Sequence, residues 1–188
     1  MTQFIIYSDR ISALTAEAKT DFSSKLKTKS FKKGEFINKE GQICRNLYFI
    51  ERGLAKHYYF HKGRIFILRF FDENQIFTSI DSFVNQSPAE FMTVALEDME
   101  TTYLDFWDVE DLCKKHHSFE TFIRKVFTVI SLNSLKRLKE MFDKDASELY
   151  TSFLNENHHL MQRVSLGDIA SYLGISQVSL SRIRAKNV

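Results

Sequence analysis

The feature that most constrains the fold of this chain is a change in the spacing of apolar residues between positions 31 and 106. Within this range, short runs rich in aliphatic and aromatic residues alternate with glycines at positions 34, 41, 53 and 63. The runs are EFIN, LYFIERGLAKHYYF, RIFILRFF, MTVALE and TTYLDF. Glycine accepts the positive φ of tight turns, so the pattern predicts short strands joined by turns. Such strands favour an antiparallel sheet that rolls up on itself, interrupted by a helix at 79–86.

Apolar residues recur at steps of three and four on both sides of the predicted strands, as they do along one face of a helix. One such pattern predicts a helix over residues 8–29, whose buried face is formed by Ile11, Leu14, Ala18, Phe22 and Leu26. The other pattern predicts a long helix from Phe119 to Phe142. Its apolar surface is wide, so the helix either covers the sheet alone or also pairs with the same helix of a second copy. We favour pairing, with Asn133 setting the register, although a solvated surface Asn explains that residue equally well.

The last part of the chain has a helical pattern again. The segment ASELYTSFLNE at 146–156 predicts a helix, and HHLMQRV at 158–164 predicts an extended connection. The stretch SLGDIASYLGISQVSLSRIRAK at 165–186 then predicts two short helices around Gly174, which suits the left-handed residue that ends a helix. Ser165 is the predicted N-cap of the first helix. The residues that would join the two helices are Leu166, Ile169, Ala170, Leu173, Ile175, Leu180 and Ile183. This order of elements predicts a helix-turn-helix.

The outward face of the second helix suits duplex DNA, because a helix of this size fits the major groove. Arg182 has the donors to bind guanine, Gln177 can pair with adenine, and Val178 suits a thymine methyl group. The predicted DNA-binding residues are Ser176, Gln177, Val178, Ser179, Ser181, Arg182 and Lys186. The simpler alternative is an antiparallel helical hairpin without a role in DNA binding. We favour DNA binding because several features of this segment agree with it. The helices have N-cap residues, a glycine forms the turn, apolar residues pair between the helices, and the C-terminal end is basic and contains no acidic residue.

The composition narrows the class of protein. A net charge of +2 in 188 residues is too small to argue for nucleic acid from totals alone. Cys44 and Cys113 are isolated, so we expect neither a disulfide framework nor a clustered metal site, and the usage fits a reducing cytoplasm. No apolar run is long enough to span a membrane, and the N-terminus has no signal-peptide pattern. We therefore predict a cytoplasmic protein with no membrane partner.

Enzymatic and metal chemistry find little support. His57 and His61 with Cys44 suggest a metal in a cupin-like roll, but such sites need a denser histidine cluster and an acid. Residues on strand surfaces explain these side chains more simply. The aromatic residues of 58–71 could line an apolar pocket, but we favour the ordinary core of the roll for them. We predict no catalytic residue, no metal and no cofactor. The alternative function that stays open is a cupin-like small-molecule-binding protein or enzyme with a helical interaction tail.

The segment DIASYLGISQVSLSRIRAK resembles the helix-turn-helix of the Crp/Fnr family of bacterial transcription regulators. The segment FKKGEFINKEGQICRNLYFIERGLAKHYYF resembles the opening strands of that family's cyclic-nucleotide-binding β-roll. The resemblance implies an α+β fold with an antiparallel jelly-roll sensor, a long dimerisation helix and a C-terminal winged-helix-type helix-turn-helix. The implied domains are residues 1–117, 118–144 and 145–188. It also implies a homodimer on a two-fold-symmetric duplex, with a small-molecule effector and RNA polymerase as candidate partners.

Two departures from the family pattern change these expectations. Thr78 and Ser79 stand where cyclic-nucleotide-binding members have Gly-Glu, and Ala89 and Glu90 stand where they have Arg followed by Ser or Thr. A cyclic phosphate needs a cation or a set of N–H donors, and Glu90 would repel it. These four residues are the effector-pocket candidates, and we predict an effector other than cyclic AMP. The chain also stops soon after Lys186, so a wing is expected to come from the region of 158–164 instead.

Overall fold

The computed structural model describes residues 2–186, with the side chain of Lys186 outside the described part. The chain divides into two compact units. The first comprises Met1–His57 with Phe70–Ser131, and the second comprises Tyr58–Arg69 with Leu132–Val188. The second unit therefore combines Tyr58–Arg69, which is most of one β-hairpin, with the C-terminal helices, although these segments lie far apart in the sequence.

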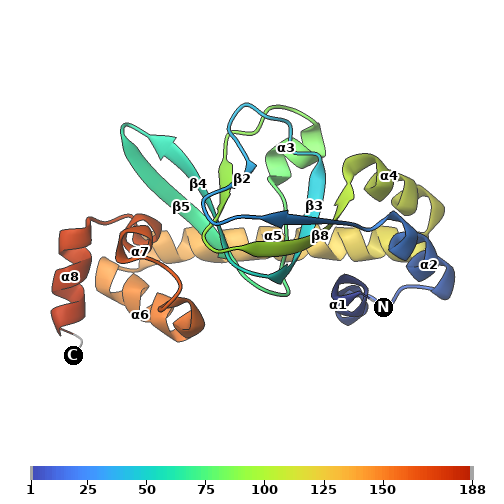
Figure 1. The fold of residues 1–188 in the computed structure, drawn as a ribbon. Helices are drawn as coiled ribbons and strands as arrows, with labels where there is room; N and C mark the ends of the chain where they lie inside the picture. The colour runs from blue at the N-terminus through green and yellow to red at the C-terminus, as the bar shows by residue number, and fades with distance from the viewer. Residues whose placement is uncertain (1, 187–188) are drawn as a thin grey trace. The chain divides into compact units, whose positions relative to one another are not determined.

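Two four-stranded sheets form the β-roll (Figure 1), with strand orders β1-β8-β3-β6 and β2-β7-β4-β5. The strands are β1 Lys27–Phe31, β2 Phe36–Asn38, β3 Asn46–Arg52, β4 Ala55–His61, β5 Arg64–Phe71, β6 Ile76–Phe77, β7 Met92–Ala95 and β8 Met99–Asp105. The central pair is antiparallel, with Tyr48 of β3 opposite Tyr103 of β8. The prediction of an antiparallel roll built from these segments is confirmed, including the short helix α3 at Ile80–Asn85.

Gly53, in the turn between β3 and β4, is the one glycine whose neighbours leave no room for a side chain. Its φ is +105°, and an added Cβ would lie 2.6 Å from Cγ of Met99 and 2.8 Å from the carbonyl oxygen of Asp98. The Gly53 N–H donates a 2.8 Å hydrogen bond to Oε1 of Glu73. This turn therefore depends on glycine for both its conformation and its close approach to β8.

The N-terminal helices are α1 Gln3–Ile11 and α2 Ala16–Lys25, so the prediction of a single helix over 8–29 is wrong. Thr15 interrupts it: its side-chain oxygen accepts a hydrogen bond from the N–H of Ala18 at 3.2 Å and caps α2. Residues from Lys27 onward pair with β8 instead. Of the five predicted buried positions, Leu14, Ala18 and Phe22 are buried, whereas Ile11 and Leu26 are only partly buried.

Phenylalanines dominate the core of the first unit. Phe4 of α1 stacks on Phe49 of β3 with ring centroids 4.9 Å apart, and it meets Phe22 of α2 edge-on at 5.1 Å. Phe119 and Phe122, from the start of α5, complete the cluster and are fully buried. Such ring pairs add to the apolar area that they bury, so this cluster anchors α1, α2 and α5 against the sheet.

The long helix α5 runs from His117 to Asp143 and is unbroken (Figure 1), which confirms the predicted long helix. It follows α4, Phe106–Lys115, a helix that the sequence analysis did not predict. The first part of α5 is buried, but its apolar residues further along are exposed. These residues are Val129, Leu132, Leu135, Leu138, Met141 and Phe142, with exposed fractions of 50–81%. Beyond its middle, α5 therefore presents an uncovered apolar surface.

The C-terminal helices of the second unit are α6 Ala146–Glu156, η1 His158–Leu160, α7 Leu166–Leu173 and α8 Gln177–Lys186. The extended connection predicted at 158–164 is wrong, because Leu160 and Val164 are buried and the backbone turns to bury them. Every element in the described part of 132–186 is helical, so the wing expected near 158–164 does not form there. Within residues 2–186, no helix combines the length and hydropathy that crossing a membrane requires.

Candidate nucleic-acid interface

Local capping defines the two helices of the predicted motif. Ser165 Oγ accepts a hydrogen bond from the N–H of Asp168 at 3.1 Å, which caps α7. Gly174 ends α7 with φ +72° and ψ +20°, the left-handed conformation that glycine favours. Ser176 Oγ then accepts a 3.1 Å hydrogen bond from the N–H of Ser179 and caps α8. Residues 165–186 thus form the helix, tight turn and helix that the sequence predicts.

The inner face of the motif is apolar and closed. Ile169 and Leu173 of α7 and Leu180 of α8 are all buried, with Leu180 only 1% exposed. Ala170 is buried as well, and its carbonyl oxygen accepts a 3.0 Å hydrogen bond from the N–H of Ile175 in the turn. These residues hold α8 from behind and decide which of its side chains face outward.

The outer face of α8 carries the residues predicted to bind DNA. Ser176, Gln177, Val178, Ser181 and Arg182 are exposed, and Ser179 is half-buried. Val178 has an exposed fraction of 62%, which is high for an apolar side chain on a short helix. Lys186 is the last residue of α8, and its side chain lies outside the described part. The helix α8, Gln177–Lys186, contains no Asp or Glu.

Gly167 is a residue of this site that sequence analysis missed. A Cβ on Gly167 would lie 3.1 Å from Nε2 of Gln177. This separation is tighter than an ordinary contact, so the absence of a side chain at position 167 leaves room for the Gln177 amide beside α7. The sequence signal was a glycine within the first turn of a helix, where it costs stability relative to alanine.

The second half of α5 supports the motif through polar contacts. The Arg137 guanidinium lies over the ring of Tyr172 on α7, 4.0 Å from the ring centroid, and it donates a hydrogen bond to the Tyr172 carbonyl oxygen. Phe153 of α6 packs on the same ring at 5.2 Å. Lys136 forms an ion pair with Glu156 of α6 at 2.7 Å. These contacts connect α5, α6 and α7 within the second unit.

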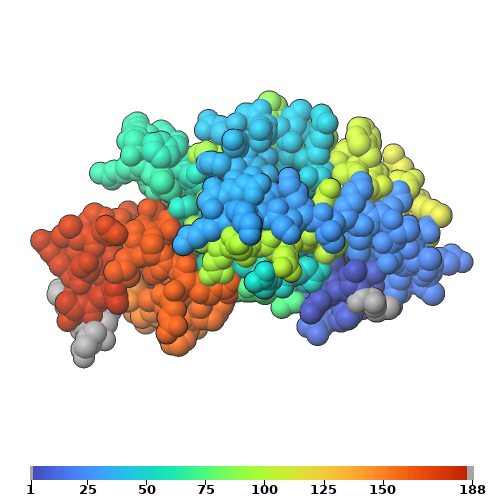
Figure 2. All heavy atoms as spheres, viewed as in Figure 1, coloured from blue at the N-terminus to red at the C-terminus, as the bar shows by residue number. Residues whose placement is uncertain are grey.

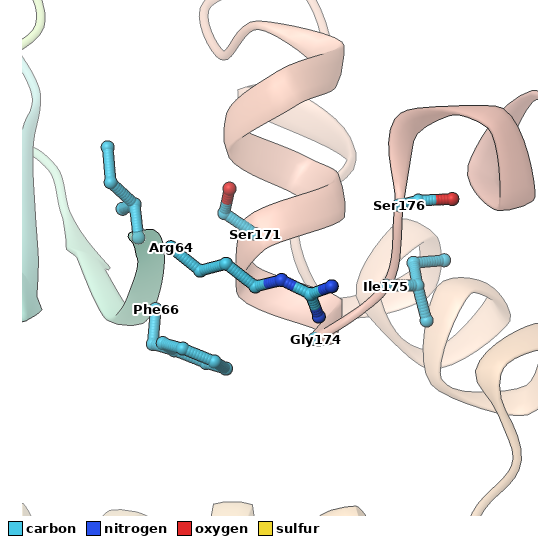
Figure 3. A pocket seen from close by; sticks show the side chains of 7 residues that line it. Arg64, Phe66, Ser171, Gly174, Ile175 and Ser176 are labelled. Atoms are coloured by element: carbon cyan, nitrogen blue, oxygen red, sulfur yellow. The ribbon is translucent and has the colours of Figure 1, made fainter. Parts of the chain in front are cut away.

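A pocket of about 320 Å³ lies between the β4–β5 hairpin and the turn of the motif, and both segments line it (Figure 3). Its lining residues are Arg64, Ile65, Phe66, Ser171, Gly174, Ile175 and Ser176. The favoured assignment of the aromatic residues of 58–71 to the core of the roll is correct for Tyr58, Phe70 and Phe71, which are buried, but wrong for Phe60, which is 56% exposed. Phe66 lines the pocket beside the helix-turn-helix instead. No local pattern could show that these distant segments meet.

Two of the four effector-pocket candidates, Ser79 and Glu90, contact a residue that was not predicted, Asp81. Its carboxylate accepts hydrogen bonds from Ser79 Oγ at 3.1 Å and from the backbone N–H of Glu90 at 3.5 Å. Thr78 Oγ1 donates to the carbonyl oxygen of Asn46 at 3.0 Å. Ala89 is buried, and its backbone pairs with residues 41 and 42. An anionic ligand here would meet the Asp81 carboxylate and the nearby Glu90.

His57 and the cysteines lie apart from one another. His57 Nδ1 lies 2.9 Å from Thr93 Oγ1, and burial lowers the pKa of His57 to about 4, so its ring is neutral near pH 7. The N–H of Cys44 donates to Ser82 Oγ at 2.8 Å, and His61 is exposed at the hairpin tip. Across the described residues, no group of three or more His, Cys, Asp or Glu side chains is arranged to hold a metal ion.

The chain is similar to known proteins both in sequence pattern and in fold. Residues 28–116 match the cyclic nucleotide-binding domain family. No curated protein sequence matches the chain. Among solved structures, the c-di-GMP-responsive global regulator CLP from Xanthomonas campestris has a TM-score of 0.73 at 14% identity, covering 92% of this chain and 91% of CLP.

Two further structures show the same fold. FixK2 from Bradyrhizobium japonicum has a TM-score of 0.71 at 20% identity, covering 86% of this chain and 83% of FixK2. A protein from Eubacterium rectale assigned to the Crp/Fnr family of transcriptional regulators has a TM-score of 0.74 at 17% identity, covering 90% of this chain and 82% of that one. Residues 28–116 are therefore similar to the cyclic nucleotide-binding domain family, and the chain has the fold seen in these structures of Crp/Fnr-type transcriptional regulators.

Proposed function

We propose that this protein is a dimeric, non-enzymatic transcription regulator of the Crp/Fnr type that binds duplex DNA through α8. The observation that carries the proposal is the division of α8 into two faces. Leu180 is buried against α7, whereas Gln177, Val178, Ser181 and Arg182 are exposed on a face without carboxylates. An exposed valine between polar and basic residues suits the methyl groups of a major groove.

Each exposed residue has a distinct part in the proposed complex. Arg182 donates two hydrogen bonds to a guanine, and Gln177 pairs with an adenine or a phosphate. A well-placed pair of this kind discriminates between bases by about 1–3 kcal/mol. Ser176, Ser179 and Lys186 bind phosphates, helped by the positive N-terminal end of α8. The phosphate contacts position the helix, and the base contacts supply the sequence preference.

The exposed apolar surface on α5 supports pairing with a second copy of the chain. Leu135, Leu138 and Phe142 recur at steps of three and four, so they share one face, and each is at least half exposed. An apolar face of this extent is unusual on a monomer, and a helix that pairs with its own copy buries it symmetrically. Asn133 is exposed on the same part of α5, and we assign it the register of the pair.

We assign sensing to residues 1–117, pairing to 118–144 and DNA binding to 145–188. An effector would act by shifting the population between DNA-competent and incompetent dimers. The residues around Asp81 argue against cyclic AMP as that effector, because they offer carboxylates where a phosphate needs a cation. Thr78, Ser79, Ala89 and Glu90 stay our effector-pocket candidates, of which Glu90 is exposed and the other three are buried. RNA polymerase is a candidate partner of the DNA-bound dimer, and the site of action would be the cytoplasm.

The experiment that tests this function is the selection of bound duplexes from a random pool by the full chain. We expect a two-fold-symmetric sequence whose half-sites are about one helical turn apart, because two recognition helices of a dimer must reach one face of the DNA. The variant Arg182→Ala should lose the sequence preference while keeping its fold. If no duplex is enriched, or if the enriched sequence is the same for Arg182→Ala, the assignment of α8 to DNA is wrong.

A further inference from the structure

The tip of the β4–β5 hairpin is a tight turn with a basic residue in an unfavourable backbone conformation. Lys62 has φ +48° and Gly63 has φ +76°, the two positive values of a type I′ turn. Glycine, asparagine and aspartate adopt this conformation most easily. The turn alone therefore explains Gly63 but does not explain a lysine at position 62.

All the charged side chains of the β4–β5 hairpin are basic. Residues 53–71 contain no Asp or Glu, and their cationic side chains are Lys56, Lys62, Arg64 and Arg69. His61, Lys62 and Arg64 at the tip are all exposed. Among residues 2–186, neither Lys62 nor Arg64 has a carboxylate within ion-pairing distance. In the space-filling view, the hairpin, coloured teal, stands open to solvent (Figure 2). The tip is thus a concentrated and unneutralised positive charge.

This charge lies beside the turn of the helix-turn-helix. Arg64, Ser171, Gly174 and Ser176 line one pocket, and the Arg64 side chain extends towards the turn at Gly174 (Figure 3). The helix α8 begins at Gln177, directly after this turn. The phosphates that flank a recognition helix lie next to its N-terminal end, where the turn enters it. The hairpin tip is therefore placed near the expected path of the DNA backbone.

We infer that the β4–β5 hairpin is a second DNA-contacting element, in which Lys62 and Arg64 bind backbone phosphates beside α8. The inference rests on the proposed function, because it takes its position from DNA bound by α8. Duplex DNA carries one negative charge per about 1.7 Å of its axis, so two exposed cations next to the motif gain phosphate contacts without reading sequence. The described part of residues 132–186 has no strand for this task, and the hairpin supplies the flanking contact from the β-roll instead.

The dependence of DNA affinity on salt concentration distinguishes the proposed phosphate contacts of the hairpin from the base contacts of α8. Each phosphate contact contributes about 0.9 to the slope of log affinity against log salt concentration. We expect Lys62→Asn and Arg64→Ala each to reduce that slope by about 0.9 for the selected duplex, and the double variant to reduce it by about twice as much. The order of preference among duplexes should stay unchanged, whereas Arg182→Ala should change it. Fluorescence anisotropy of the full chain at several salt concentrations gives both quantities.

Two controls keep the test decisive. Lys62→Asn removes the charge but favours the turn, so its melting temperature should be equal to or above that of the unchanged chain. Lys33→Ala removes an exposed lysine from the loop between β1 and β2, and it should leave the slope unchanged. If the unchanged chain binds DNA while both hairpin variants keep its slope, the hairpin inference alone is overturned. If the unchanged chain binds no duplex, both proposals fall.

Discussion

The Arg137 guanidinium on α5 lies over the ring of Tyr172 on α7 and also donates a hydrogen bond to the Tyr172 carbonyl oxygen. One side chain thus holds both the ring and the backbone of the helix that supports α8. The same helix α5 carries the apolar surface that we assign to dimerisation. Arg137 is therefore one contact through which a change in the position of α5 would reach the helix-turn-helix.

We expect Arg137→Ala to lower the free energy of unfolding of the second unit by about 1–3 kcal/mol, because it removes a cation–π contact and a charged hydrogen bond. Arg137→Lys keeps the charge but loses the planar donor group, so its effect should be smaller. Amide hydrogen exchange along α7, together with urea unfolding, measures both. Unchanged exchange in α7 for the alanine variant would contradict the role assigned to this contact.

Leu180→Ala and Val178→Ala form a matched pair on opposite faces of α8. Leu180 is 1% exposed, and its truncation should cost about 2–5 kcal/mol of stability. Val178 is 62% exposed, so its truncation should change stability by less than about 0.5 kcal/mol while weakening binding to the selected duplex. Thermal unfolding and anisotropy distinguish the two effects. The reverse result would show that the inner and outer faces have been exchanged.

Gly167→Ala should change the base preference of DNA binding without lowering the stability of the fold. Alanine is favoured over glycine in a helix by about 1 kcal/mol, so the melting temperature should not fall. The new Cβ would lie 3.1 Å from Nε2 of Gln177 and push that amide aside. We therefore expect a change in base preference at the position that Gln177 contacts, visible as altered enrichment in the duplex selection. Identical enrichment would mean that the Gln177 amide does not read a base.

The stability of the first unit should depend on pH through His57. Its pKa is about 4 in the folded chain because burial disfavours the charged ring, against 6.5 for an ordinary histidine. Between these values the unfolded chain binds a proton that the folded chain does not, so the free energy of unfolding falls as the pH falls. The loss is at most about 1.4 kcal/mol per pH unit, or about 3 kcal/mol over the window.

The variant His57→Gln should remove this part of the pH dependence, whereas His117→Gln, which changes an exposed histidine, should keep it. Urea unfolding at several pH values measures the difference, and an NMR titration of the imidazole gives the pKa directly. Carboxylates with a lowered pKa, such as Asp98 and Asp111, titrate below about pH 4 and so contribute mainly below this window. A midpoint near 6.5 for His57 would contradict the burial argument.

Cyclic AMP should not raise the melting temperature of the chain. A ligand that binds only the folded state stabilises it in proportion to the logarithm of its concentration. The segment that matches the family's phosphate site presents the Asp81 carboxylate, which accepts hydrogen bonds from Ser79 and from the backbone of Glu90. The cation that a phosphate needs is not among these residues. Differential scanning fluorimetry over a range of concentrations tests this, and a saturable rise would overturn the argument.

Patterns that depend on near neighbours could be predicted from the sequence alone. The caps at Ser165 and Ser176, the left-handed Gly174 and the buried Leu180 follow from residues within one or two helical turns, because caps and faces are local. The strands between 36 and 105 and the long helix α5 followed from the period of their apolar residues in the same way.

Contacts between distant segments were decided only by the tertiary structure. The approach of Arg64 to the turn at Gly174, the pairing of β1 with β8 and the stacking of Phe4 on Phe49 each bring together segments far apart in the chain. No local pattern records such pairs, since their energy is gained only when the whole fold closes. The sequence by itself determined the helix-turn-helix that we propose to face DNA, whereas the packing of the hairpin beside that motif decided which further charges lie next to it.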